Sequence, residues 1–207
     1  MIKVEPSLLK SSNRYAYSRL IVTFGLLFVS SLLLLQPVGA LFKVLLVVAS
    51  GFMMAGFFSV MHYCCHGTFF TQKYMNRRFG QLLASTMLMN FASYKFFHMQ
   101  HHRRTTVVGD SEPAGEIRNV WQYFWSALNW DYITAFARMS LGGIFGYFPF
   151  FVRSQKACQE VKADAWLSLG FIAVILWLTW FFPFQTLLIY WLPVQLAFSL
   201  NFFYVIW

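Results

Sequence analysis

Charged residues are scarce in this chain, since only 11% of its 207 residues are Asp, Glu, Lys or Arg. A soluble globular domain carries about 25% of these residues. The shortage excludes an ordinary water-soluble fold, and the rest of the composition agrees, because 58% of the residues are hydrophobic and 21% are aromatic. The sequence therefore predicts an integral membrane protein.

Acidic residues and cysteines are also few. Seven Asp and Glu stand against 16 Lys and Arg, which gives a net charge of +9. In a soluble protein this excess would suggest nucleic-acid binding, but the charges here lie in segments between apolar runs, so we exclude a nucleic-acid partner. The three cysteines are odd in number and two are adjacent. They do not suggest a disulfide framework, and they fit a reducing compartment.

Four apolar runs approach the length that a helix needs to cross about 30 Å of hydrocarbon. They cover residues 20–42, 44–61, 165–182 and 184–207. The first run is too long for a cleaved signal peptide, so we expect it to be retained. Short connections pair the runs into two helical hairpins. The predicted fold class is an all-α integral membrane protein of about four spans, with a single domain over residues 1–207.

The distribution of charge predicts the orientation of these spans. Among the Lys and Arg residues, only Lys43 falls in a turn between two paired spans. The others, and all acidic residues, fall in residues 1–19, 62–118 and 119–164. Two hairpins place these three segments on one side of the membrane, and the excess of Lys and Arg predicts that this side is cytoplasmic.

Two segments between the spans are expected to lie at the membrane surface. Residues 79–97 are moderately apolar but contain Asn90 and Lys95, and we interpret them as re-entrant or interfacial. Residues 119–151 are rich in aromatic side chains, which favour the headgroup region and predict helices lying on the surface. A break in these helices is expected at Gly142-Gly143.

The strongest chemical signal is the placement of the histidines. All five lie in two short clusters, His62 with His66, and His98 with His101 and His102. On a helix, residues three or four positions apart share a face. Neutral imidazole is the commonest protein ligand for transition metals. Five on two convergent faces exceed what core packing needs, so we predict that all five are metal ligands and that both clusters meet on one side of the membrane.

The first cluster suggests two narrower interpretations. The spacing of His62 and His66 also occurs in helical zinc proteases, but that chemistry needs Glu directly after the first histidine, and position 63 is Tyr. Cys64 and Cys65 are candidate soft ligands. However, adjacent residues on a helix diverge by about 100°, so both cannot join the histidine face. We interpret them as small apolar packing residues.

The segments HYCCHGTFF (62–70) and FHMQHHRRT (97–105) resemble the first two histidine boxes, HxxxH and HxxHH, of the membrane-bound fatty acid desaturase family. The 31 residues between the boxes also fit, and the GTFF flank is similar to the acyl-lipid branch. The resemblance implies a desaturase that introduces a double bond into a fatty acyl lipid with O2 and a non-haem di-iron centre. It implies that His62, His66, His98, His101 and His102 are iron ligands. It also implies an electron donor on the cytoplasmic side, such as cytochrome b5 or ferredoxin.

The sequence departs from the family pattern in two places. Tyr63 stands where the first box often has Asp, a carboxylate that would orient the ligands. The family also has a third histidine box after the last spans, and no histidine follows His102 here. We therefore expect a C-terminally truncated piece of a longer enzyme, inactive by itself.

Other residues receive weaker assignments. Asn201, a polar residue in the last predicted span, is a candidate for approaching the metal. A basic group is a candidate for docking an acidic electron donor or lipid phosphates, although ordinary cytoplasmic-side charge explains it as well. Its members are Arg77, Arg78, Arg103 and Arg104.

Two rival functions stay open. A membrane di-iron hydroxylase or ketolase acting on alkanes, sterols or carotenoids shares the same box pattern. From a different class, a non-catalytic metal-binding membrane protein would also carry these histidines. The sequence does not predict regiospecificity, the acyl carrier or substrate-binding residues.

Overall fold

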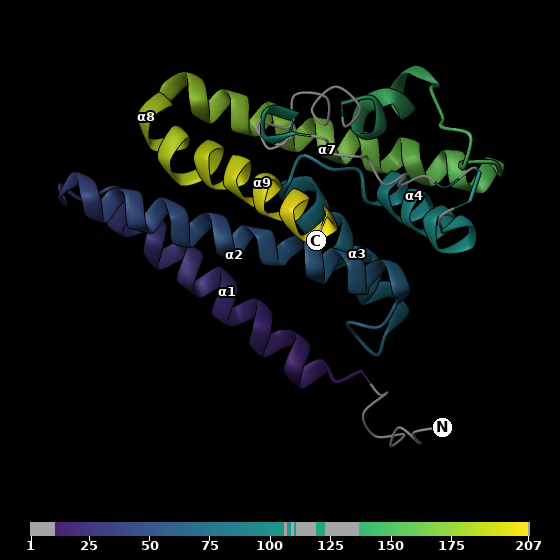
Figure 1. Cartoon of the computed structure of the whole chain (residues 1–207), viewed down its shortest axis with the longest axis horizontal. Coiled ribbons are helices and arrows are strands. Elements are labelled where there is room, and N and C mark those ends of the chain that lie inside the picture. Colours follow the sequence, from purple (N-terminus) through teal and green to yellow (C-terminus); the bar gives the residue numbers. More distant parts are fainter. Residues whose placement is uncertain (1–10, 106, 109, 111–118, 123–136, 207) are drawn as a thin grey trace.

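The computed structural model describes residues 11–105, 107–108, 110, 119–122 and 137–206, with side chains described as far as residue 200. Within these ranges every regular element is helical, as the prediction of an all-α protein required. The elements are α1 (Asn13–Leu34), α2 (Ala40–His66), α3 (Lys73–Thr86), α4 (Phe91–Arg104), a 3-10 turn η2 (Gly142–Phe145), α7 (Gln155–Phe181), α8 (Pro183–Thr186), a π-helical turn η3 (Leu187–Trp191) and α9 (Leu192–Ile206) (Figure 1).

Three helices of the described chain, α1, α2 and α7, are long and apolar enough to cross a membrane. Large hydrophobic side chains stand exposed on their outer faces, among them Ile21 and Phe28 on α1 and Trp180 on α7. Contiguous apolar surface of this kind is unfavourable in water and suits contact with lipid. The helices therefore have the surface of an integral membrane protein.

The bounds of the helices differ from those of the predicted spans in several places. The predicted first span, residues 20–42, runs through a turn, because α1 ends at Leu34 and α2 begins at Ala40. Gln36, Pro37 and Gly39 mark this turn, and proline disfavours helix in the residue before it. At the other end, α7 begins at Gln155 rather than near residue 165, since Ser154 caps a polar first part of the helix.

The fourth predicted span is helical from Pro183 to Ile206 but is not one continuous α-helix. The π-helical turn η3 ends at Trp191, two residues before Pro193. Proline has no N–H to donate and clashes with the preceding turn, and a local π-helical turn accommodates both effects. The number of membrane crossings stays a prediction.

Close packing joins α9 to α2. A Cβ atom added at Gly51 of α2 would lie 2.7 Å from the Cβ of Leu196, so only glycine lets the two helices approach this closely. Nearby, the rings of Phe58 and Phe198 meet with their centroids 5.2 Å apart. Small residues at helix crossings are typical of membrane proteins, where tight packing replaces the hydrophobic driving force between helices.

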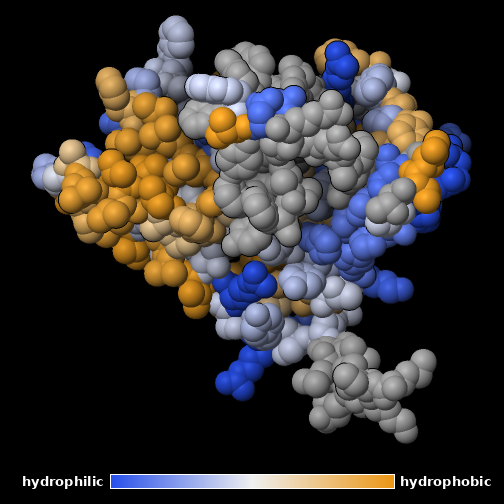
Figure 2. Space-filling view, in the orientation of Figure 1, coloured by the Kyte–Doolittle hydropathy of each residue, from blue (hydrophilic) through white to orange (hydrophobic). Residues whose placement is uncertain are grey.

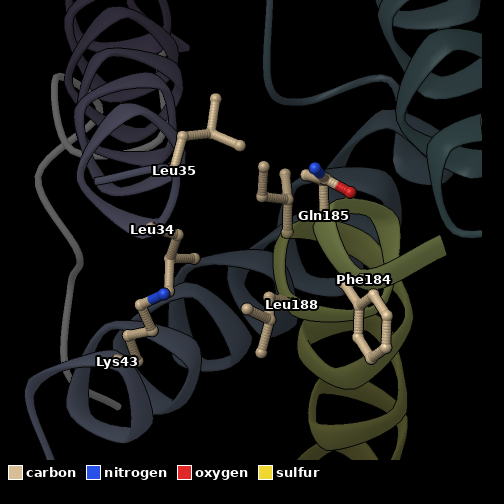
Figure 3. Close-up of a pocket in the computed structure, with 7 residues that line it drawn as sticks. Leu34, Leu35, Lys43, Phe184, Gln185 and Leu188 are labelled. Carbon is tan, nitrogen blue, oxygen red and sulfur yellow. The ribbon is translucent and has the colours of Figure 1, made fainter. Parts of the chain in front are cut away.

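The turn between α1 and α2 and the turn between α7 and α9 lie at the same end of the molecule, opposite α4 (Figure 1). Residues near both turns line one cleft (Figure 3). The lining residues are Leu34, Leu35, Lys43, Phe184, Gln185, Leu188 and Ile189. Figure 2 shows hydrophobic residues gathered toward this end and mostly hydrophilic residues toward α4. The described chain is thus divided into an apolar end, which contains the turns, and a more polar end.

Residues 79–97, predicted to be one re-entrant or interfacial segment, form parts of two helices. With 14 residues each, α3 and α4 are about 21 Å long and too short to cross a bilayer. Helix α3 packs along α2, and the chain turns at Leu88, whose φ of 58° is unusual for a bulky residue. The buried side chains of Met87 and Met89 hold this turn in place.

The predicted surface helices of residues 119–151 lie partly outside the described residues. Residues 137–141 are helical, and the 3-10 turn η2 begins at Gly142, which agrees with the predicted break. Both glycines are buried. A Cβ atom at Gly143 would lie 3.0 Å from the Cγ1 of Val161, so this glycine also allows η2 to pack closely on α7.

Candidate metal centre

The C-terminal end of α2 carries His62 and, in its last turn, His66, and the helix ends at His66. Gly67 has a left-handed conformation (φ 69°), and its N–H donates to the carbonyl of Cys64 at 3.1 Å. Glycine adopts this conformation without steric cost, which makes it the usual residue after a helix C-terminus. The chain therefore turns away directly after His66 and leaves both imidazoles at the helix end.

The segment after Gly67 is fixed by one buried side chain, Asn76 of α3. Its Oδ1 accepts hydrogen bonds from the backbone N–H groups of Phe69 (3.1 Å) and Phe70 (2.9 Å). Its Nδ2 donates to the carbonyl of Phe70 at 2.8 Å. The Phe70 side chain is fully buried. These contacts give the GTFF segment a structural role, which is to return the chain from α2 into α3.

The N-terminus of α4 is held by two side chains. The Oδ1 of Asn90 accepts a hydrogen bond from the N–H of Ser93 at 2.9 Å, and its Nδ2 donates to the carbonyl of Val161 at 2.8 Å. The Oδ2 of Asp164 accepts from the N–H of Ala92 at 2.8 Å. A carboxylate at a helix N-terminus accepts hydrogen bonds from N–H groups that have no partner within the helix. Its negative charge also interacts favourably with the positive end of the helix dipole. Helix α4 is thereby fixed against α7.

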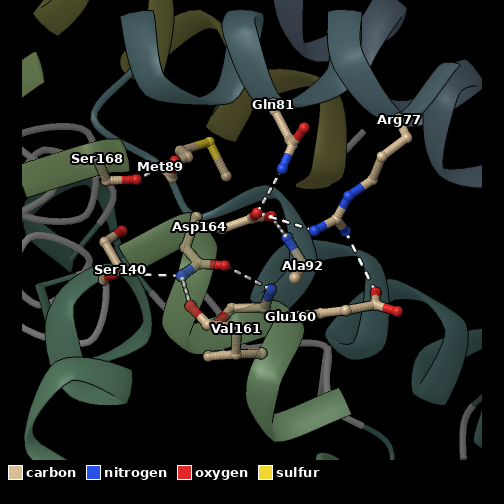
Figure 4. A network of polar contacts seen from close by, with 11 residues as sticks. Arg77, Gln81, Met89, Ala92, Ser140, Glu160, Val161, Asp164 and Ser168 are labelled. Atoms are coloured by element: carbon tan, nitrogen blue, oxygen red, sulfur yellow. Dashed lines mark hydrogen bonds and ion pairs between the residues drawn. The ribbon is translucent and has the colours of Figure 1, made fainter. Parts of the chain in front are cut away.

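Figure 4 shows the rest of this polar network. The Oδ1 of Asp164, a residue whose side chain is 2% exposed, accepts from Arg77 at 2.8 Å and from Gln81 at 2.6 Å. Arg77 also contacts Glu160 at 3.3 Å. Because Arg77 and Gln81 belong to α3, the network joins α3, α4 and α7. Asp164 was not among the predicted site residues, although an acidic residue directly before an apolar run is a recognisable signal.

The two histidine clusters meet. The ligand atoms of His62, His66, His98 and His102 all lie within 4.8 Å of one another. The Nε2 atom of His98 lies 3.1 Å from that of His66 and 2.9 Å from that of His102. These four residues, from α2 and α4, are called the four-histidine group below. Its convergence is the arrangement that the spacing of the two clusters predicted.

The geometry of the four-histidine group fits a transition-metal ion. A ring nitrogen carries either one hydrogen or one lone pair, so the Nε2 of His98 cannot make two well-aligned hydrogen bonds at once. Around an octahedral ion with metal–nitrogen bonds of about 2.1 Å, adjacent nitrogens lie about 3 Å apart, whereas around a tetrahedral ion they lie about 3.4 Å apart. The two short Nε2 distances match the octahedral value. A donor set of imidazoles alone favours iron, zinc or copper over Mg²⁺ or Ca²⁺.

The four-histidine group lies at the edge of the hydrophobic core. His98 is buried, whereas His66 and His102 are exposed. Cys64 and Cys65 belong to the core, packed with residues such as Met61, and neither is in the four-histidine group. Their predicted role as apolar packing residues is confirmed.

His101, the fifth predicted ligand, does not belong to the four-histidine group. Its Nδ1 lies 2.8 Å from the Oδ1 of Asp110. The sequence analysis did not single out Asp110, although it is the first acidic residue after the second cluster. The structure thus separates the five histidines into a group of four and one that is paired with a carboxylate.

The remaining candidates have different surroundings. Arg77 is engaged with Asp164 and Glu160, so it belongs to the polar network of Figure 4. Arg78, Arg103 and Arg104 are exposed. The side chain of Asn201 lies outside the described residues.

Comparison with known proteins supplies the last observation. No curated protein matches the chain at a significant level. The family model described as "Fatty acid desaturase" matches residues 39–207, a region that contains both histidine clusters and every helix from α2 to α9. The chain therefore belongs to the fatty acid desaturase family.

Proposed function

We propose that this chain is the metal-binding membrane domain of a fatty acyl desaturase, which introduces a double bond into an acyl chain with O2 and a histidine-ligated di-iron centre. The observation that carries the proposal is the convergence of four imidazoles from α2 and α4. Family membership supports iron over the other metals that imidazole binds.

The residues present fit iron. His62, His66, His98 and His102 would hold an ion, and imidazole is a common iron ligand. Bound iron with O2 supplies the removal of hydrogen from an unactivated C–H bond, which no amino-acid side chain accomplishes.

The chain itself contributes rigidity and an apolar setting. His98 is held on a helix whose N-terminus is fixed by Asn90 and Asp164, so its ring is positioned before any ligand binds. Phe58 and Met61, within the turn of α2 before the histidines, are buried. An aliphatic chain is compatible with these surroundings, and the packed side chains keep water from the core side of the centre.

The proposal includes four spans and an orientation with the histidines on the cytoplasmic side. The distribution of Lys and Arg supports this side. An acidic electron donor, such as cytochrome b5 or ferredoxin, would then meet the exposed side chains of Arg78, Arg103 and Arg104.

Metal analysis of the purified 207-residue chain tests the proposal. We expect iron to copurify with the chain from iron-supplemented cells, and His98→Asn to reduce its content at least tenfold. Met99→Leu, at the neighbouring position of α4, is the matched control and should retain the metal. Binding of zinc alone, or of no metal, would contradict the proposal and favour a different kind of membrane protein.

Product analysis tests the reaction. Membranes containing the longer enzyme of which this chain is expected to be a piece, supplied with an acyl lipid, O2 and a reduced electron donor, would yield an unsaturated acyl chain. A hydroxylated or oxo product would instead assign the related hydroxylase or ketolase chemistry.

A further inference from the structure

The cleft shared by the α1–α2 turn and the α7–α9 turn lies at the end of the molecule away from α4 (Figure 1). Its volume is about 160 Å³. This is roughly ten times the space that one water molecule needs, so a length of acyl chain has room there. The lining is hydrophobic except for Lys43 and Gln185, which face the cleft from its two sides (Figure 3). Apolar walls with a cation and an amide have the amphipathic composition that a membrane lipid requires.

Lys43 is isolated from every other charged side chain in its part of the sequence. It is the only Asp, Glu, Lys or Arg in the ranges 20–72 and 165–207. Its side chain is half-buried. No ion pair among the described residues includes it. Lysine is also uncommon on the membrane side opposite to the excess of Lys and Arg. Among the described residues, then, no carboxylate neutralises this ammonium group.

The depth of the cleft suits a lipid headgroup. The helices α1 and α7, which are long enough to cross a membrane, end beside it at Leu34 and Phe181. Trp180, in the last turn of α7, is 83% exposed. Exposed tryptophan is enriched where hydrocarbon gives way to headgroups, which is also the depth of the phosphate groups. The π-helical turn η3 supplies Leu188 and Ile189 to the cleft, and such turns are frequent at functional sites.

We propose that this cleft binds an anionic phospholipid of the leaflet around the two turns. The phosphate pairs with Lys43, and one acyl chain lies against the hydrophobic wall that includes Leu34 and Leu188. A zwitterionic headgroup is a poorer match, because neither sequence range contains an acidic side chain to attract its cationic part. The bound lipid would contact both hairpins at once. This site is separate from the metal centre and does not depend on the reaction.

Photo-crosslinking of the purified 207-residue chain in phosphatidylcholine nanodiscs tests the site. The probe is a trace of phosphatidylglycerol with a diazirine on one acyl chain, and mass spectrometry locates its adducts. We expect adducts on residues 34–43 and 184–189. Unlabelled phosphatidylglycerol should suppress them about fivefold more effectively than added phosphatidylcholine with the same acyl chains, which is the preference that one lysine near the membrane surface supplies. Adducts on Phe28, exposed on the outer face of α1, should be suppressed equally by both lipids.

Variants at position 43 test the role of the charge. Lys43→Gln should remove the preference for phosphatidylglycerol at the cleft, and Lys43→Arg should retain it. Lys73→Gln is the matched control, because it changes the net charge by the same amount at an exposed position in the first turn of α3. It should leave the preference unchanged.

A second pair of variants tests the acyl-chain part of the cleft. Leu35→Trp adds a large side chain at a lining residue that is 53% exposed, so the fold tolerates it. We expect it to reduce the adducts on residues 184–189 several-fold. Leu41→Trp makes the same change at the same end of the molecule but outside the cleft, at a residue that is 75% exposed, and should not reduce them.

Three results would each overturn the inference. They are equal suppression of the cleft adducts by both phospholipids, a preference that persists in Lys43→Gln, and an absence of adducts at the cleft, as a second copy of the chain seated there would cause. None of these measurements involves a metal ion, so the proposed function stands or fails separately.

Discussion

Gly80 shows how closely a single residue controls the placement of the histidine-bearing helices. It lies in α3, opposite Phe91 at the start of α4, and an added Cβ atom would overlap the Phe91 ring. Phe91 is 1% exposed, so its ring has no free space into which to move. The absence of a side chain at position 80 is therefore what allows α3 and α4 to pack together.

We predict that Gly80→Ala lowers the stability of the protein. Overpacking costs about 1–3 kcal/mol, and the better helix propensity of Ala offsets about 1 kcal/mol of this. The melting temperature in detergent should fall. Gly25→Ala, in α1, is the matched control, since no atom lies within 4 Å of its added Cβ. An equal melting temperature for the two variants would show that Phe91 relaxes freely.

At the residue scale, the sequence predicted which histidines meet but not which residues hold them in place. Spacing alone indicated that His62, His66, His98 and His102 converge, because a helix brings residues four apart to one face. The same reasoning gave no information on Asn76 or Asn90. Their function depends on backbone groups that the fold brings to them, and Asn90 meets Val161 across 71 residues of sequence.

At the scale of elements, α3, α4 and α7 are joined by the carboxylate of Asp164. Removing one partner of a buried charged pair leaves the other partner without compensation and typically costs 3–5 kcal/mol. Here the loss also frees the N–H of Ala92 at the beginning of α4 and the amide of Gln81. The element that carries His98 and His102 is thus coupled to two others through one side chain.

We predict that Asp164→Ala destabilises the protein by roughly 3 kcal/mol, measured by thermal unfolding in detergent. The double variant Asp164→Leu with Arg77→Met should recover part of this loss, because no charge is left unpaired. Glu160→Gln serves as control. Its side chain is 32% exposed, so its ion pair with Arg77 contributes about 0–1 kcal/mol. A larger effect at Glu160 than at Asp164 would contradict this account.

The sequence predicted the types of elements better than their limits. Apolar runs marked the long helices and the turn between the first two, but they did not show where α1 ends or that α7 has a polar first part. The short helices α3 and α4 were predicted as one segment. Their separation depends on the turn at Leu88, where packing of Met87 and Met89 holds a backbone conformation that local propensity disfavours.

At the scale of the whole molecule, the α1–α2 turn and the turn between α7 and α9 lie at one end and α4 lies at the other (Figure 1). The predicted pairing of apolar runs as two hairpins requires this arrangement. The number and the orientation of the spans depend on where the membrane lies along the helices. A labelling experiment therefore addresses the question directly.

We predict that residues 74 and 104 are accessible from the cytoplasmic side and residue 36 from the opposite side. Tyr74→Cys, Arg104→Cys and Gln36→Cys, each in a Cys158→Ser background, can be labelled with an impermeant maleimide in sealed vesicles of both orientations. All three positions are exposed in the structure. Labelling of residues 74 and 104 from opposite sides would contradict the two-hairpin topology.

The close contact of α9 with Gly51 has a consequence for biosynthesis. The ribosome completes α2 well over a hundred residues before it reaches Leu196, so the surface around Gly51 enters the bilayer without its protein neighbour. Lipid tails occupy that surface first and must be displaced when α9 arrives. Contacts between segments this distant in sequence form late. We therefore expect a newly made chain to be exposed to quality-control proteases until α9 closes onto α2.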